Sequence, residues 1–83
     1  MTDTHNADLT LLSRFLRLQA LTGEAVSVHL SAGGVQVTVL GVLREDPKVS
    51  HRRQLDLFGE VVLSFSTMNV EEVEGSRIHL KLL

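Results

Sequence analysis

Cysteine is absent from this chain of 83 residues. Because disulfide bridges, thiolate metal ligands and cysteine nucleophiles all need a thiol, the absence excludes these three chemistries together. The first residues, MTDTHNAD, are polar and acidic, whereas a secretory leader is basic and then apolar. Arg14 and Arg17 interrupt the apolar stretch that follows, so we expect no membrane span. These features predict a cytoplasmic protein of bacterial or phage type.

A strong net charge is also missing, since the formal net charge at pH 7 is −2. A chain with this balance has little general affinity for a phosphate backbone. The cations are nevertheless clustered between residues 44 and 53, as Arg44, Lys48, Arg52 and Arg53. Such a cluster is typical of a solvated loop, and it is also the candidate surface for binding RNA or single-stranded DNA.

The length is that of one small domain, which is expected to bury roughly 60% of the surface that its unfolded chain exposes. We expect residues 1–7 to be disordered and residues 8–83 to form the domain. Apolar residues recur at helical spacing from Leu9, which predicts a helix over about 8–22 that stops at Gly23. The apolar arc of this helix is wider than one face of a small sheet can cover. Part of it is therefore expected to contact a second subunit.

After Gly23 the apolar period changes to two, which is typical of strands. Alternation over 26–31 and 35–40, with the turn Ala32-Gly33-Gly34 between them, predicts a hairpin. Gly41 interrupts the second strand, where a bulge or a sharp bend is expected. Residues 44–53 hold the only proline of the chain and predict an exposed connection.

Three further strands are expected, over 55–66, near 67–73 and from 77 to the end, with a turn at 74–76. The sequence thus predicts a mainly β, small α+β fold, in which a helix precedes a five-stranded, strongly bent antiparallel sheet. Phe58 and Val62 fall on the otherwise polar face of the third strand, so a second surface is expected to cover them. The predicted oligomer interface is therefore made of Leu11, Phe15, Leu18, Phe58 and Val62.

This order of elements resembles the Sm-like family, whose fold is a small barrel of SH3 type. Residues 15–34, FLRLQALTGEAVSVHLSAGG, resemble the stretch of the Hfq-type bacterial RNA chaperones where the helix ends and the first strand begins. Residues 73–78, VEGSRI, resemble the second Sm motif, in which apolar residues flank Arg-Gly. The resemblance implies an Sm-like barrel over 8–83 that self-associates into an oligomer such as a ring.

Two positions depart from the family's RNA-binding pocket. Sm-like rings hold a base between a loop that carries Asp and Asn and a second loop that carries Arg-Gly. In this chain no Asn follows Asp46 in register, and Glu74 stands where the family has Arg. The charge is reversed at the contact that must be positive, so RNA binding through that pocket is disfavoured.

The run Gln54-Leu55-Asp56-Leu57-Phe58 resembles the pentapeptide by which bacterial replication and repair proteins dock on the DNA sliding clamp. A peptide of this kind is extended and inserts its Leu and Phe side chains together into an apolar groove. The same run also begins an alternation that continues to Phe65, which favours a core strand. A strand directs Leu57 and Phe58 to opposite faces. Both interpretations stay open.

The remaining polar residues give no catalytic pattern. His29 and His79 are expected to point away from the core and to approach each other if the first and last strands pair. Two imidazoles can begin a metal site, but no third ligand follows at a suitable spacing. The serines lack a spaced His and Asp, so we expect no enzyme, no cofactor and no metal. The predicted function is a non-catalytic binding or adaptor module, with sliding-clamp binding and nucleic-acid binding as the alternatives.

Overall fold

The computed structural model describes residues 12–81. The first element of this part is a helix at residues 12–20. The expected helix over 8–22 is confirmed at these positions, whereas its first residues lie outside the described part, as does the disorder expected for 1–7. Gly23 follows with a φ of +89°, in the left-handed region, and its N–H donates to the Leu43 carbonyl oxygen at 2.7 Å. The helix therefore stops where the sequence predicts. It is not long and apolar enough to cross a membrane, and no other helix in the described part is either.

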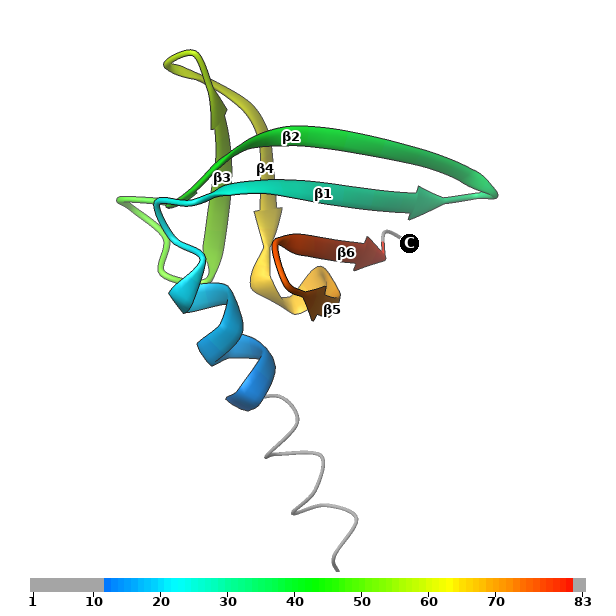
Figure 1. Ribbon diagram of the computed structural model, residues 1–83, viewed down its shortest axis with the longest axis horizontal. Coiled ribbons are helices and arrows are strands. Elements are labelled where there is room, and N and C mark those ends of the chain that lie inside the picture. Colours follow the sequence, from blue (N-terminus) through cyan, green and yellow to red (C-terminus); the bar gives the residue numbers. More distant parts are fainter. Residues whose placement is uncertain (1–11, 82–83) are drawn as a thin grey trace, which may run out of the picture.

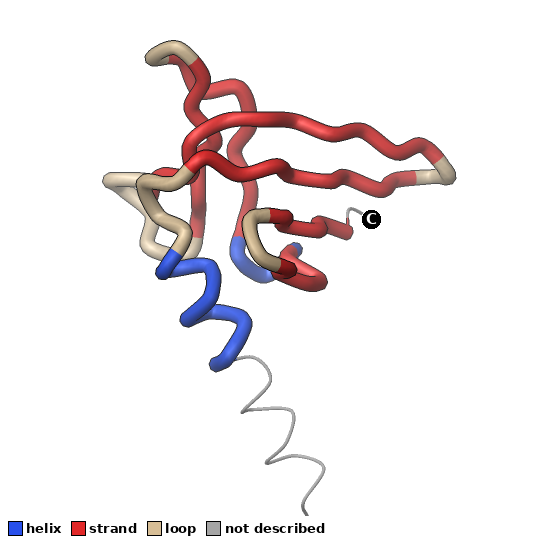
Figure 2. Tube along the Cα trace, in the orientation of Figure 1, coloured by secondary structure: helices blue, strands red, loops and turns tan. Residues whose placement is uncertain are grey.

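Six strands and a 3-10 helix follow: β1 (Ala25–Ala32), β2 (Val35–Glu45), β3 (Arg52–Leu57), β4 (Glu60–Ser66), η1 (Thr67–Asn69), β5 (Val70–Glu74) and β6 (Arg77–Lys81). They form one sheet in the order β4-β3-β2-β1-β6-β5 (Figure 1). Neighbouring strands are antiparallel, except that β1 and β6 are parallel. Figure 2 shows the β1–β2 hairpin reaching well beyond the other strands on one side.

This architecture corrects the expected five-stranded antiparallel barrel. The sheet has six strands and is mixed, because β6 runs parallel to β1. It is also open, since the two outer strands, β4 and β5, are not neighbours in the strand order of the described residues. A barrel requires its outer strands to pair and close the sheet. The helix followed by a mainly β domain is confirmed, and the closed barrel is wrong.

The sixth strand arises because the expected strand over 55–66 is a hairpin, with Phe58 and Gly59 as its turn. A two-residue turn reverses which alternate positions face the core. In β4 a β-bulge at Val62 reverses them again, since Leu55 pairs with Leu63 while Asp56 pairs with Val61. Turn and bulge together keep the core residues at odd positions on both strands. The alternation of the sequence therefore passes through the turn without a break.

Gly41 marks a close approach of β2 to β3. A Cβ atom at this position would lie 2.8 Å from the Asp56 carbonyl oxygen and 2.8 Å from Leu55 Cγ. Real side chains do not tolerate such distances, so only glycine fits while the backbone stays where it is. Figure 1 shows β2 curving at this end to meet β3. The bulge expected at Gly41 is wrong, because β1 and β2 pair in unbroken register through this position, whereas the curvature of β2 fits the expected bend.

The core lies on one face of the sheet under the helix. Its buried apolar residues are Leu18, Val26, Val28, Leu43, Leu55, Phe65, Val70, Val73, Ile78 and Leu80. The helix is held across β5 by two hydrogen bonds, in which Arg14 Nη1 donates to the Val70 carbonyl oxygen at 3.0 Å and Arg17 Nη1 to that of Val73 at 3.3 Å. These bonds satisfy backbone acceptors on an outer strand, which positions the helix beside η1.

Candidate partner-binding surface

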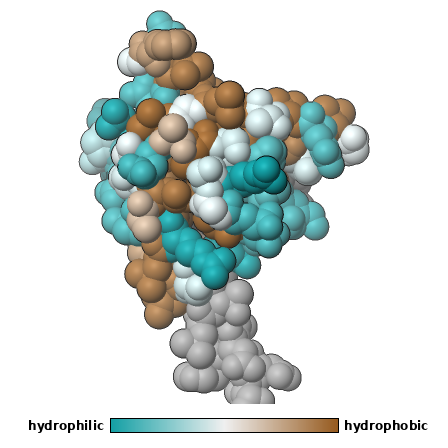
Figure 3. Space-filling view, viewed as in Figure 1, coloured by the Kyte–Doolittle hydropathy of each residue, from teal (hydrophilic) through white to brown (hydrophobic). Residues whose placement is uncertain are grey.

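Large apolar side chains are exposed in four regions of the described chain: on the helix, along the β1–β2 hairpin, on the β3–β4 hairpin, and on η1. They are Leu12, Phe15, Leu16, Val35, Val37, Leu40, Leu57, Phe58, Val61, Val62 and Met68. Figure 3 shows apolar atoms gathering at the end of the β3–β4 hairpin and along the β1–β2 hairpin. Single exposed apolar residues are ordinary, but groups of them mark interaction surfaces. The candidate site is therefore a surface for a partner.

Phe58 stands out among these residues. Its side chain is 98% exposed, and its φ of +54° lies in the left-handed region, followed by +83° at Gly59. Two positive φ angles in a two-residue hairpin loop are those of a type I′ turn, which favours Asn-Gly. A bulky residue in this conformation costs about 1–2 kcal/mol. The chain thus holds its most exposed aromatic ring at a strained position, which is typical of a functional constraint.

The run 54–58 is divided between core and surface. Leu55 is fully buried, and β3 pairs with β2 on one side and with β4 on the other. Asp56 Oδ2 forms an ion pair with Arg44 Nε at 3.3 Å. Leu57 is 39% exposed and Phe58 98%. The core-strand interpretation is therefore confirmed for Leu55, while the last two residues of the run remain accessible at the hairpin end.

Arg53, expected on a basic surface, is buried, with 2% of its area exposed. Its Nη1 donates to the carbonyl oxygens of Ser50 at 2.9 Å and Arg52 at 3.0 Å, and its Nη2 donates to Gln19 Oε1 at 3.1 Å. Its Cζ atom also lies 5.9 Å from the centroid of the Phe15 ring. Arg53 therefore fixes the connection before β3 against the helix and is removed from the candidate nucleic-acid surface.

The other three basic residues stay at the surface, though not as one unpaired patch. Arg44 is engaged by Asp56, and Arg52 Nε donates to Ser64 Oγ at 3.3 Å. Lys48 lies in the connection that Asp46 folds into a turn, where Asp46 Oδ1 accepts from the Lys48 N–H at 2.8 Å. Part of the positive charge of the cluster is thus compensated within the sheet, so the remaining cations offer only a weak binding surface for a phosphate backbone.

The predicted oligomer interface is divided in a similar way. Phe15, Phe58 and Val62 are exposed as expected. Leu18 is buried in the core, because it lies on the face of the helix that packs on the sheet, so it is not an exposed interface residue as expected. Leu11 lies outside the described residues.

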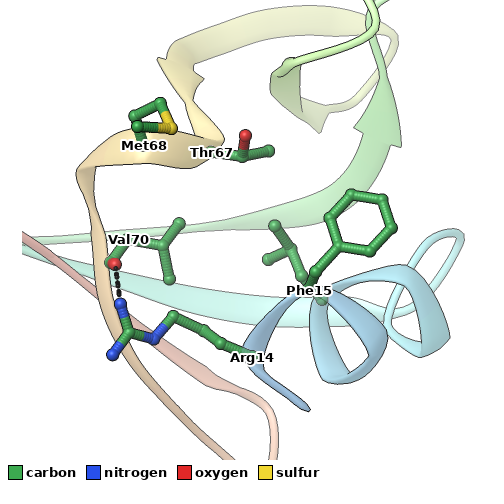
Figure 4. A pocket seen from close by; sticks show the side chains of 6 residues that line it. Arg14, Phe15, Thr67, Met68 and Val70 are labelled. Carbon is green, nitrogen blue, oxygen red and sulfur yellow. Dashed lines mark hydrogen bonds between the residues drawn. The ribbon is translucent and has the colours of Figure 1, made fainter. Parts of the chain in front are cut away.

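A pocket of about 260 Å³ opens between the helix and η1 (Figure 4). Its lining residues are Arg14, Phe15, Leu18, Thr67, Met68 and Val70. Leu18 and Val70 are buried and close the pocket on the inside, whereas Met68 is 86% exposed. No pattern in the sequence indicates this site, because its two halves lie some fifty positions apart and meet only when the helix docks on β5.

The two histidines meet as the sequence predicts. His29 and His79 are register partners on β1 and β6, and their rings stack with centroids 5.0 Å apart. The hydroxyl groups of Ser27 and Thr38 lie 3.0 Å and 3.2 Å from the ring nitrogens of His29. Within residues 12–81 no group of three or more His, Asp or Glu side chains is arranged to hold a metal ion. The pair is therefore a cross-strand contact of the sheet.

Comparisons of this chain with protein-family models, with curated proteins and with solved structures found no match. The fold and the surface define a small α+β domain with exposed apolar hairpins and an apolar pocket. Its function has to be argued from these residues.

Proposed function

We propose that this protein is a non-catalytic binding module that self-associates through its exposed apolar side chains. The observation that carries the proposal is Phe58, which is 98% exposed in a strained backbone conformation. Leaving such a ring in water forfeits about 1.5–3 kcal/mol of burial energy, and the strain adds to this cost. A surface contact that buries the ring offsets both terms, so the arrangement favours association over a solitary chain.

An Sm-like relationship is part of this proposal. The helix that precedes the sheet supports it, as does the pairing of the first strand with the last. The parallel direction of that pairing and the open sheet depart from the family's pattern. The proposal therefore depends on the exposed surface more than on the resemblance.

Self-association predicts a concentration-dependent mass. In sedimentation velocity at tens of micromolar, we expect a species heavier than one chain that dissociates on dilution, because a contact made by a few exposed apolar side chains gives moderate affinity. A single species with the mass of one chain at every concentration up to the solubility limit would contradict the proposal.

A second candidate is binding of the bacterial sliding clamp through residues 54–58. It is favoured by one observation: Leu57 and Phe58, the residues that such a peptide inserts into its groove, are the exposed apolar members of the run. Gln54, which would set the direction of docking, is only partly buried.

For this candidate we expect purified clamp to retain the wild-type protein. The double variant Leu57→Ala, Phe58→Ala should bind the clamp with an affinity at least about tenfold lower, as for the removal of hot-spot residues. The matched control is Val35→Ala, Val37→Ala, which removes two exposed apolar side chains from the other hairpin and should be retained like the wild type. Equal retention of all three proteins would dismiss clamp binding through this run.

A further inference from the structure

The pocket between the helix and η1 has the chemistry of a site for an aromatic ring. Leu18 and Val70 give it an apolar floor. Met68 brings a thioether, which forms favourable contacts with the edges of aromatic rings, and Phe15 brings a ring that can pack edge to face. Arg14 brings a guanidinium group, which is attracted to a ring face. Figure 4 shows Phe15, Met68 and Arg14 around the same opening. Three side chains with a specific affinity for aromatic groups thus share one pocket.

The pocket also has room for such a ring. An apolar cavity of about 150 Å³ is large enough to bind benzene, and this pocket measures about 260 Å³. A phenyl group with its methylene linker therefore fits, and space remains for the backbone that carries it.

The chain itself contains one aromatic residue free to enter. It has three Phe and neither Trp nor Tyr. Phe65 is buried in the core and Phe15 lines the pocket, whereas Phe58 is 98% exposed. The end of a hairpin also suits insertion into a pocket, because its narrow two-residue turn projects a single side chain.

Phe58 cannot reach the pocket of its own chain. The hairpin end and η1 lie at opposite ends of β4 (Figure 1). β4 has seven residues, which at about 3.3 Å each separate its ends by about 20 Å. A phenyl side chain is far shorter than this separation, so the ring that enters must come from another molecule.

The charges at the two surfaces are complementary. Glu60 is exposed and stands two positions after Phe58, so its carboxylate accompanies the ring. The charged residue in the described lining of the pocket is Arg14, a cation. Opposite charges at the rim favour docking in one orientation, whereas an acidic pocket rim would repel the carboxylate of Glu60.

On the basis of the self-association proposed above, we infer that the β3–β4 hairpin end of one copy inserts Phe58 into the pocket between the helix and η1 of a second copy. The two surfaces that meet are different, so the contact is heterologous: each copy has one projecting ring and one pocket. Repetition of such a contact gives a ring if the rotation closes and an open chain if it does not.

Two variants separate the two surfaces. Phe58→Asn removes the ring and leaves a residue that suits a positive φ, so the turn is retained. Met68→Glu places an acid at the exposed rim of the pocket, where it repels the carboxylate of Glu60. Each variant alone is expected to raise the dissociation constant of self-association at least about tenfold. An equimolar mixture of the two should form a 1:1 heterodimer with wild-type affinity, because one chain keeps its pocket and the other keeps Phe58.

A fluorescent variant reports the contact directly. Since the chain has no Trp, Phe58→Trp introduces a single fluorophore. Its emission should shift to shorter wavelength as the concentration rises, and adding Met68→Glu to the same chain should abolish the shift. Val35→Asn is the control, because it makes an equally exposed apolar position polar on the other hairpin and should associate like the wild type.

The outcomes distinguish this inference from the proposed function. A wild-type protein that stays a single chain at all concentrations contradicts both. A wild-type protein that associates while both variants associate equally well overturns the inference alone, and so does a mixture that fails to form the heterodimer. Loss of association in Val35→Asn but not in Phe58→Asn assigns the contact to the β1–β2 hairpin and likewise overturns it.

Discussion

Replacement of Gly41 by alanine is expected to lower the free energy of unfolding by about 3 kcal/mol, the range of an overpacked core position. The new Cβ would lie 2.8 Å from the Asp56 carbonyl oxygen, which belongs to the backbone of β3 and cannot turn aside as a side chain would. β2 and β3 would have to separate, and the pairing of Leu43 with Leu55 in the core would be disturbed. Urea denaturation followed by circular dichroism measures the change as a lower midpoint.

The control for this prediction is Gly34→Asn. Gly34 has a positive φ, which Asn tolerates, and no atom of the described residues lies within 4 Å of a Cβ built there. We expect its free energy of unfolding to stay within about 0.5 kcal/mol of the wild type, as for a surface substitution. If Gly41→Ala changed stability as little as this control does, the close approach of β2 to β3 would be wrong.

The second large effect is expected within the run 54–58. Leu55→Ala should lower the free energy of unfolding by about 2–5 kcal/mol, because Leu55 is fully buried and its loss leaves a cavity among the core side chains. For a small domain with a stability near about 5 kcal/mol, such a loss leaves much of the protein unfolded. Phe58→Ala, three positions later, should change stability by only about 0.5 kcal/mol, because the ring contacts water.

Thermal or urea denaturation of these two variants checks the division of the run into core and surface. Similar losses for Leu55→Ala and Phe58→Ala would show that the ring is covered within the chain, contrary to its exposure. The difference also decides how binding is tested: loss of a partner by Leu55→Ala reports unfolding, so only Leu57 and Phe58 are informative.

Local patterns in the sequence predict much of the fold. Alternation locates β1 and β2 together with the turn at Gly33 and Gly34, and the change of period at Gly23 marks the end of the helix. The sequence predicts that His29 and His79 meet if the first and last strands pair, and they do. Each of these features depends on residues within one element or on one pairing.

Features that combine two local effects are harder to predict. The turn at Phe58 is hidden because the bulge at Val62 restores the alternation that the turn reverses. The sequence does indicate the burial of Arg53, because residues 53 and 55 of a strand lie on the same face, but the charge of Arg53 suggests a surface position. Three hydrogen bonds outweigh that preference, and the one to Gln19 exists only after the helix has docked.

The arrangement of side chains on the surface is the feature that the sequence predicts least well. Met68 and Phe15 lie far apart in the chain, and their meeting at one pocket follows from the position of the helix across β5. The sequence predicts Phe58 and Val62 on the polar face of a strand. Both are exposed for a different reason, since Phe58 lies at a hairpin end and Val62 in a bulge.

Within residues 12–81 the open sheet has two flanks that pair with no further strand, and each is irregular. On β4 the bulge is at Val62, and on β5 the register shifts at Glu71, between the pairs Val70–Leu80 and Glu72–His79. An irregular outer strand cannot template a new strand along its whole length, and the acidic side chains of β5 repel a second copy of themselves. Growth into amyloid-like ribbons by strand addition is thereby opposed, even in a chain that leaves many apolar side chains in contact with water.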